Sequence, residues 1–134
     1  MKAIPKIQKY MSDNPQTINA DLSLIQAKKM FADLHIRHLP VLQNGKIVGL
    51  LSDRDVALML SFQGVNPEST TVQDAMTEKP YLTNPDASLD AVALEMAEKR
   101  YGSAIVVDNH KVVGIFTAVD GLRALSDLLH TRLA

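Results

Sequence analysis

Residues 49–55 read Gly-Leu-Leu-Ser-Asp-Arg-Asp, and residues 114–120 read Gly-Ile-Phe-Thr-Ala-Val-Asp. Each stretch has a glycine, two apolar residues, a hydroxyl residue, two variable residues and an aspartate. An apolar run followed by a hydroxyl residue, with an acid three positions later, is typical of a strand that leads into a helix N-terminus. The two stretches therefore indicate one strand-to-helix junction that occurs twice, at an offset of 65 residues.

The similarity extends well beyond these junctions. Met11–Ser61 aligns with Met76–Ser126 without a gap, and fifteen of the 51 positions are identical. Several other pairs exchange like for like, such as Ser52 with Thr117. Similarity at a fixed offset is the signature of a repeated structural unit. The chain is therefore predicted to contain two copies of one unit.

Each copy predicts the element order β-α-β-β-α, so the expected fold class is α/β (α+β) with tandem repeats. Ser23 and Gln26 form a capping-box pattern at the first helix start, and Ser88 has the same place in the second copy. Asn44-Gly45 is a strong hairpin signal. The expected strands are 16–18, 39–42 and 47–51 in the first copy, and 81–83, 104–107 and 112–116 in the second. The last helix of each copy is expected near Asp53 and near Ala118.

The predicted organisation is a first repeat at residues 6–62, a linker at 63–70 and a second repeat at 71–130. Gly64 and Pro67 mark the linker. Thr71, with Asp74 three positions later, predicts the cap of a short helix that opens the second repeat, and residues 6–11 are its counterpart. Because units this small rarely fold as separate domains, we expect the two copies to pack as one module with a shared core.

Composition and charge limit the classes of function. The chain has 134 residues, a formal net charge of −1, a pI of about 6.4 and no cysteine. Neither nucleic acid nor an anionic membrane is an expected partner, and thiolate metal sites and cysteine nucleophiles are excluded. The N-terminal residues have no apolar core segment, and no apolar run approaches the ~20 residues that span a bilayer. We expect a soluble cytoplasmic protein.

The repeated junction has two interpretations. Ser52 and Thr117 are good N-caps, and an acid at the third helical position suits the helix dipole, so both junctions could be purely structural. The reciprocal cap is usually closed by the longer Glu or Gln, however, whereas Asp55 and Asp120 are short. A short carboxylate can instead clamp two neighbouring hydroxyls such as those of a ribose, while amides at the helix start can hold a phosphate.

These motifs resemble the signature of CBS domains, named after cystathionine β-synthase. The similar features are the β-α-β-β-α order, the paired copies, the opening Met-Ser/Thr-x-x-Pro and the segment Gly-x-x-Ser/Thr-x-x-Asp. Leu39-Pro40-Val41 and the run 102–106 match as well. The resemblance covers residues 6 to 129 or so and implies a CBS pair, also called a Bateman module.

The resemblance implies a regulatory module, not an enzyme, that binds adenosine nucleotides (AMP, ADP or ATP) in clefts between the two repeats. Asp55 and Asp120 would hold ribose hydroxyls, and Ser52 and Thr117 would assist with ribose or phosphate. The residues that would enclose the base are Thr17, Ile18, His38 and Leu39 in one copy, and Tyr81, Leu82, Ser103 and Ala104 in the other. The ligand would be a nucleotide, with no required cofactor. The alternatives are another adenosyl ligand, such as S-adenosylmethionine or a cyclic dinucleotide, and a structural or interaction module with vestigial sites.

The two sites are expected to differ. The first copy has Arg37-His38 where the second has Gly102-Ser103, and Asp53-Arg54 where the second has Ala118-Val119. Arg54 is a candidate phosphate ligand, and the small residues at 102–103 leave room for a flat base. We therefore expect the two sites to bind the ligand with unequal affinities. His35 and His38 lack a third ligand, so no metal site is expected.

Apolar residues on the last helices predict self-association. Residues 56–60 are apolar on every side of their helix, and Leu122, Leu125, Leu128 and Leu129 form a broad stripe. Excess apolar helix surface suggests burial against a second chain, and the resemblance implies a disc-like homodimer of four CBS units. A further partner would be an unidentified downstream protein. An enzyme is disfavoured, because no Ser-His-Asp or metal set is evident.

Overall fold

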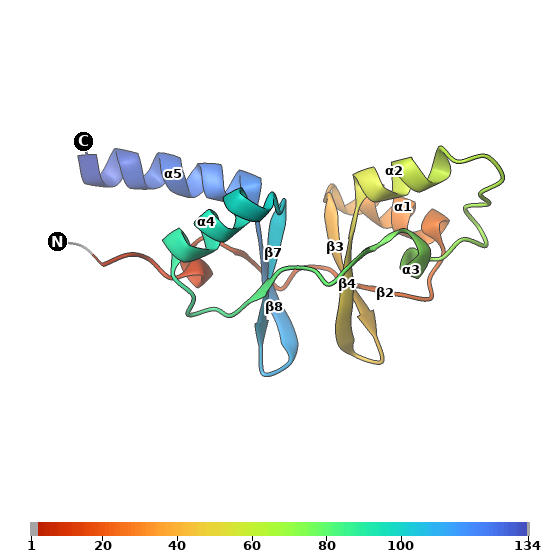
Figure 1. Cartoon of the computed structure of the whole chain (residues 1–134), viewed down its shortest axis with the longest axis horizontal. Coiled ribbons are helices and arrows are strands. Elements are labelled where there is room, and N and C mark those ends of the chain that lie inside the picture. Colours follow the sequence, from red (N-terminus) through yellow and green to blue (C-terminus); the bar gives the residue numbers. More distant parts are fainter. Residues whose placement is uncertain (1–2, 134) are drawn as a thin grey trace. The chain divides into compact units, whose positions relative to one another are not determined.

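The computed structural model describes residues 3–133, which fold into two compact units. One unit is Gln16–Pro80. The other combines the described residues up to Pro15 with those from Tyr81 onward. Each unit is a four-stranded sheet with helices packed on it (Figure 1). The α/β class and the two β-α-β-β-α copies are confirmed.

The Gln16–Pro80 unit has the sheet order β2-β3-β4-β5. β2 runs parallel to β3, and the other neighbours are antiparallel. Its strands are β2 (Ile18–Asn19), β3 (His38–Gln43), β4 (Lys46–Ser52) and β5 (Thr77–Glu78), and its helices are α1 (Leu24–Leu34), α2 (Asp53–Leu60) and α3 (Val72–Ala75).

The second unit repeats this plan with the sheet order β1-β8-β7-β6. A short 3-10 helix at Ile7–Lys9 takes the place of α3. The strands are β1 (Ser12–Asp13), β6 (Leu82–Thr83), β7 (Ser103–Asp108) and β8 (Lys111–Thr117), and the α-helices are α4 (Leu89–Lys99) and α5 (Ala118–Leu133).

The segment that opens each copy completes the sheet of the other copy. β1 pairs with β8, where Ser12 lies opposite Ile115, and β5 pairs with β4, where Thr77 lies opposite Leu50. The exchange is reciprocal, because these two pairs are related by the 65-residue offset. Each unit therefore contains residues from both sides of the predicted linker, while the predicted bounds 6–62, 63–70 and 71–130 stay a prediction.

Local signals in the sequence place most helix starts and turns correctly. The Ser23 hydroxyl accepts from the Gln26 N–H, and Gln26 accepts from the Ser23 N–H at 3.0 Å, which confirms the capping box of α1. Asn44 and Gly45 both have positive φ, as a tight hairpin requires. Ser88 precedes α4 as predicted, but its hydroxyl donates to Asp90 in place of accepting a backbone N–H.

Buried side chains form two clusters, one in each unit, while the packing of the two repeats as one module with a shared core stays a prediction. Leu24, Leu39 and Leu51 belong to the first cluster, between α1 and the β3–β4 face. Met96 and Phe116 belong to the second, which also includes Ile7 from the exchanged segment. The exchanged segments explain how each unit obtains a core of its own, because each contributes a buried apolar residue to it.

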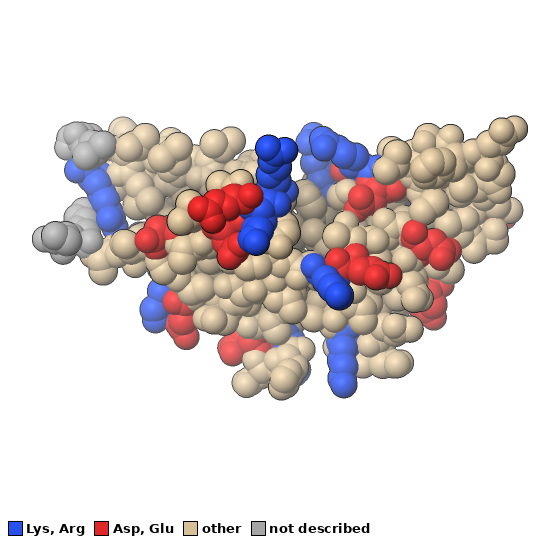
Figure 2. All heavy atoms as spheres, viewed as in Figure 1, with Lys and Arg blue, Asp and Glu red and all other residues tan. Residues whose placement is uncertain are grey.

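Acidic and basic side chains stand side by side on the face shown in Figure 2, and neither sign gathers in one area. This distribution agrees with the small net charge of the chain. Within residues 3–133, no helix has both the length and the apolar character needed to cross a membrane.

Candidate ligand-binding site

The first junction joins β4 to α2 through Ser52. The Ser52 hydroxyl accepts from the Asp55 backbone N–H at 3.0 Å, and Asp55 Oδ2 accepts from the Ser52 backbone N–H at 2.9 Å. Both residues are half-buried. No Lys or Arg of the described residues forms an ion pair with Asp55. Oδ2 of Asp55 closes the cap.

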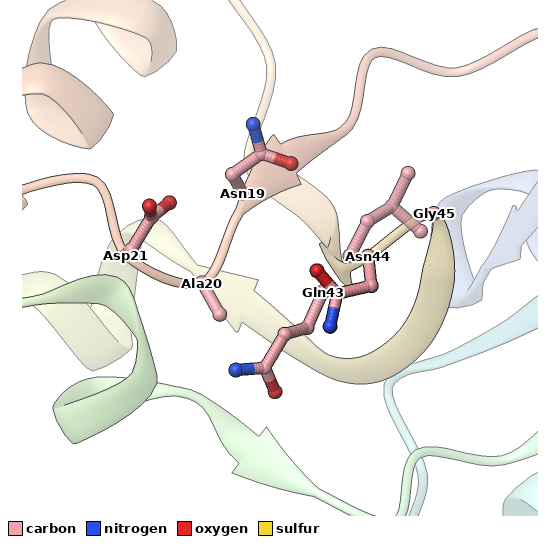
Figure 3. Close-up of a pocket in the computed structure, with 7 residues that line it drawn as sticks. Asn19, Ala20, Asp21, Gln43, Asn44 and Gly45 are labelled. Atoms are coloured by element: carbon pink, nitrogen blue, oxygen red, sulfur yellow. The ribbon is translucent and has the colours of Figure 1, made fainter.

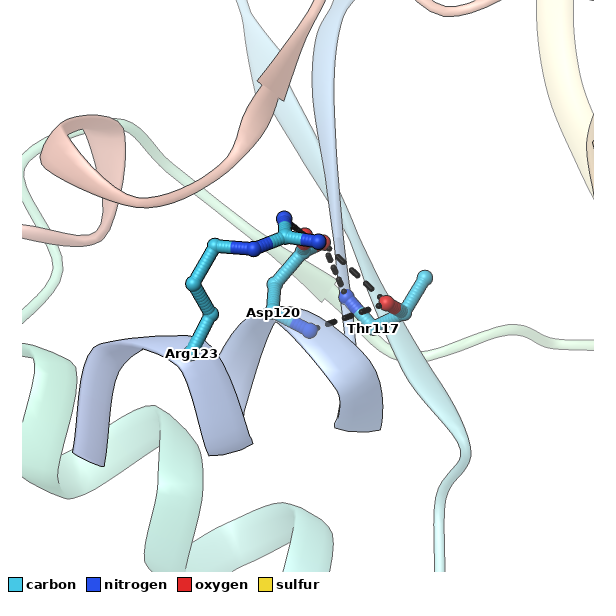
Figure 4. A network of polar contacts seen from close by, with 3 residues as sticks. All are labelled: Thr117, Asp120 and Arg123. Atoms are coloured by element: carbon cyan, nitrogen blue, oxygen red, sulfur yellow. Dashed lines mark hydrogen bonds and ion pairs between the residues drawn. The ribbon is translucent and has the colours of Figure 1, made fainter. Parts of the chain in front are cut away.

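The second junction joins β8 to α5 through Thr117 (Figure 4). Asp120 Oδ2 accepts from the Thr117 backbone N–H at 2.9 Å and from its hydroxyl at 3.1 Å. Arg123 donates to the other oxygen, Oδ1, at 3.3 Å. Asp120 is only 6% exposed. Its buried carboxylate is stabilised by the helix N-terminus through Oδ2 and by the Arg123 guanidinium through Oδ1.

Aspartate is long enough to close the reciprocal cap, so the sequence argument against the structural interpretation is wrong. The backbone N–H to carboxylate distance is the same, 2.9 Å, at both junctions. Asp74 makes a third such contact with the Thr71 N–H at 3.1 Å. Capping accounts for part of what Asp55 and Asp120 do, and a ligand-binding role needs separate support.

Ser103 provides an unsatisfied polar group beside the second junction. It is 5% exposed, and its hydroxyl has no hydrogen-bond partner among the described residues. It lies directly opposite Thr117 in the antiparallel β7–β8 pair, so the two side chains share one face of the sheet. His38 lies opposite Ser52 in the same way. The structure thus places the predicted hydroxyl and strand-end residues together in each unit.

The residues predicted to enclose a base have different exposures. Ile18, Leu39 and Ala104 are buried, Thr17, His38 and Tyr81 are half-buried, and Leu82 is 44% exposed. The Tyr81 carbonyl accepts from the Ile105 N–H at 2.9 Å, which fixes Tyr81 beside the start of β7. Ile18 is paired with Val41 in the parallel β2–β3 register.

The second junction has open space and aromatic surface nearby. A Cβ atom on Gly102 would meet no atom within 4 Å. The rings of Tyr81 and Tyr101 are stacked, with centroids 5.2 Å apart. Burial, with smaller contributions from Glu95 and Tyr101, raises the pKa of Tyr81, which favours its neutral form. Sequence reasoning missed Tyr101.

Sequence reasoning also missed Arg123, although its spacing of three from Asp120 on a helix is a recognisable signal. The equivalent position in the first copy is Leu58, which is 60% exposed. Arg54 is exposed and forms no ion pair among the described residues. The two junctions therefore differ in where they present a guanidinium: on the first turn of α2 in one unit, and paired with the aspartate in the other.

No group of three or more His, Cys, Asp or Glu side chains suited to a metal ion occurs within residues 3–133. His35 ends α1 in the left-handed conformation, at φ 54°.

Comparison with known proteins identifies the class that this fold and these junctions define. The model of the CBS domain matches residues 7–61 and 72–127. The chain belongs to the CBS domain family and carries two CBS domains. The match includes both Gly-x-x-Ser/Thr-x-x-Asp segments.

Three solved structures show the same fold. The CBS domain pair of protein MJ0100, in complex with 5′-methylthioadenosine and S-adenosyl-L-methionine, has a TM-score of 0.83 at 29% identity, over 93% of this chain and 98% of that one. CBSX2 in complex with AMP has a TM-score of 0.81 at 22% identity, over 92% and 97%. A hexameric CBS-CP12 protein from bloom-forming cyanobacteria has a TM-score of 0.85 at 22% identity, over 98% and 78%.

Some relatives are much longer proteins. L-aspartate semialdehyde sulfurtransferase of Methanocaldococcus jannaschii is 29% identical over 119 residues, which are 87% of this chain but 22% of that enzyme. The chain therefore spans about a fifth of this curated relative.

Proposed function

We propose that the chain is a non-catalytic regulatory module that binds an adenosyl ligand at the two strand-to-helix junctions. Adenine nucleotides are the first candidates, and S-adenosylmethionine is the second. The complexes of CBSX2 with AMP and of MJ0100 with adenosyl compounds support this class of ligand. The roles of the junction residues are part of the same proposal.

The buried hydroxyl of Ser103 is the observation that carries the proposal. A buried polar group without a partner costs free energy, and such groups are rare unless something else satisfies them. A ligand hydroxyl or ring nitrogen next to Thr117 would supply the missing hydrogen bond.

The aspartates would contribute through the carboxylate oxygens that do not close the caps. At Asp55 this oxygen is Oδ1, with which no Lys or Arg of the described residues forms an ion pair. At Asp120 the corresponding oxygen is held by Arg123, whose side chain is 73% exposed. An exposed guanidinium can leave the carboxylate for a ligand phosphate at small cost, because such pairs are weak. We therefore propose that ribose replaces Arg123 at Asp120 and that Arg123 then binds phosphate.

The competing function is an interaction module whose junctions are only helix caps. The closed capping boxes at both junctions favour it. Calorimetric titration with AMP, ADP, ATP, S-adenosylmethionine and cyclic dinucleotides separates the two. The proposal predicts binding with unequal affinities at the two junctions. Absence of binding at millimolar ligand would favour the interaction module, and two equal sites would contradict the inequality.

We also propose that the chain forms a homodimer through α2 and α5. Leu122, Leu125 and Leu129 are 67%, 53% and 49% exposed and lie on one face of α5. Leu58 on α2 and Phe62 just beyond it are 60% and 56% exposed. Exposed apolar stripes of this kind are typical of surfaces that are buried against a partner.

A further inference from the structure

Two hydrogen bonds join the N-terminal arm, residues 3–11, to the end of α5. The Tyr10 hydroxyl donates to Asp127 Oδ2, and the Arg132 guanidinium donates to the Ala3 carbonyl at 2.9 Å. Figure 1 shows the arm and the end of α5 at the same end of their unit. The bonded residues are 117 and 129 positions apart in the sequence, so the first and last described segments of the chain hold each other.

Tyr10 is the centre of this contact. Its ring packs against the buried cluster that includes Ile7, as does Leu128 of α5. The hydrogen bond to Asp127, with a smaller contribution from burial, raises the pKa of Tyr10, so the hydroxyl keeps its proton and remains a donor near neutral pH. The Lys9 ammonium lies 5.6 Å from the centre of the same ring. Tyr10 therefore contacts α5 through both its ring and its hydroxyl.

The distal half of α5, residues 126–133, has little other support. Among residues 126–132, Leu128 is half-buried and the others are exposed. The proximal half is anchored differently, because Asp120 and Ala124 are only 6% and 2% exposed. Two helical turns without tertiary contacts are marginal in water. The arm therefore supplies a large part of the contacts that keep the distal half helical.

The other unit lacks both these contacts and the helix extension. Ala75 is the counterpart of Tyr10, and Phe62 is the counterpart of Asp127, so the equivalent hydrogen bond cannot form. The helix α2 ends at Leu60 after 8 residues, whereas α5 has 16. The helix is thus long only in the unit whose exchanged segment can hold its distal half.

The ion pair at the base of the arm is also absent from the other unit. Lys6 donates to Asp86 at 3.0 Å, and the counterpart residues are Thr71 and Asp21. Asp21 and Gln43 line an open pocket, but the carboxylate and the carboxamide lie on opposite sides of the chain segment there (Figure 3). The pocket therefore has no acceptors that converge on one cation, and the difference between the units lies in the arm.

We propose that the N-terminal arm is a latch that orders the distal half of α5. Release of the arm frees these turns and with them Leu129, which is 49% exposed and belongs to the apolar stripe with Leu122 and Leu125. Attachment of the arm therefore controls how much of the stripe is available to a second copy of the chain. This consequence rests on the homodimer proposed above, whereas the latch itself does not.

Amide hydrogen exchange followed by NMR tests the latch. The variant is Tyr10→Phe, which removes the hydroxyl and keeps the ring, in a Leu125→Glu background, so that no dimer interface protects α5. Exchange of residues 126–133 should accelerate about three- to tenfold, as expected for the loss of one hydrogen bond. Tyr101→Phe is the matched control and should leave this exchange unchanged, because the Tyr101 ring stacks on Tyr81 and does not contact the arm.

Exchange of residues 103–117 should stay the same in Tyr10→Phe, since the latch acts on α5 and not on the sheet. Unchanged exchange of residues 126–133, or the same acceleration throughout the unit, would overturn the latch. So would an absence of protection in residues 126–133 before any change to Tyr10.

Light scattering over a range of concentrations tests the consequence for self-association. The double variant Tyr10→Phe with Arg132→Ala removes both hydrogen bonds and leaves the apolar stripe intact. Its dimer dissociation constant should rise about twofold or more, because each copy must first order its distal half. Dimerisation equal to that of the unmodified chain would overturn the control of self-association. A monomeric unmodified chain would reject the homodimer, while the exchange measurement still decides the latch.

Discussion

Met11 packs against Gly114 so closely that a Cβ atom at position 114 would clash with the Met11 sulfur. Met76 has the same relationship to Gly49. Each methionine precedes the exchanged strand that pairs with the strand containing that glycine. The glycine of each Gly-x-x-Ser/Thr-x-x-Asp segment therefore makes room for the exchanged segment, and the rest of the motif forms the junction.

Gly114→Ala should lower the free energy of unfolding by about 1–3 kcal/mol, because overpacking displaces Met11 and strains β8. The measurement is urea unfolding at equilibrium. Gly102→Ala is the matched control and should be nearly neutral, since nothing lies within 4 Å of its Cβ position. Equal destabilisation by the two variants would show that the Met11 contact is not the reason for the glycine.

Ile7→Ala should destabilise the unit that contains β7 and β8, although residue 7 belongs to the segment that opens the first repeat. Ile7 is fully buried in the cluster of that unit, and truncation of a buried isoleucine costs about 2–5 kcal/mol. Hydrogen exchange should show lost protection across residues 89–117 and little change across 24–52. Val72→Ala, its counterpart, should give the reverse pattern. Equal loss in both units would contradict the exchange.

Ser103→Ala should leave stability unchanged or raise it by up to about 1 kcal/mol, because the removed hydroxyl has no partner. The same change should weaken binding of the adenosyl ligand about tenfold, since the ligand loses a buried hydrogen bond. Thermal unfolding without ligand and calorimetry with ligand measure the two effects. A variant that loses stability but keeps full affinity would assign Ser103 to the fold alone.

Leu125→Glu should convert a dimer of about 29 kDa, twice the chain mass of 14.7 kDa, into a monomer. A charge in the middle of the α5 stripe cannot be desolvated cheaply in an apolar interface. Light scattering at tens of micromolar measures the mass. Leu94→Glu is the control, because Leu94 is 59% exposed but lies on α4, outside the proposed surface. A monomeric unmodified chain would reject the dimer.

The sequence was sufficient for features that depend on neighbouring residues. Asn44-Gly45 requires a tight turn because both residues have positive φ, and Ser23 with Gln26 caps a helix wherever it lies. The repeat then extended each assignment to the second copy. The expectation that the hydroxyl caps the helix in the same way fails at Ser88, because the nearby Asp90 accepts a hydrogen bond from that hydroxyl.

Long-range partners could not be read in the same way. The offset shows that Lys6–Met11 and Thr71–Met76 are equivalent, but either could pair with its own copy or with the other. Side-chain reach was also misjudged, because Asp55 and Asp120 do close their caps. Burial without a partner, which marks Ser103, depends on packing and has no signal in the sequence.

The central claim is that the junctions bind an adenosyl ligand as well as cap helices. Calorimetric titration with AMP and S-adenosylmethionine of four chains tests it most directly: unmodified, Asp55→Ala, Asp120→Ala and Asp74→Ala. Asp74 closes the cap at Thr71 with the same geometry but lies outside both junctions. Each cap loss should cost about 0.5–2 kcal/mol of stability.

If the claim is correct, Asp55→Ala and Asp120→Ala each weaken or abolish one of two unequal binding events, and Asp74→Ala binds like the unmodified chain. If no ligand binds at millimolar concentration, or if all three variants lose affinity alike, the aspartates are helix caps only and the claim is contradicted.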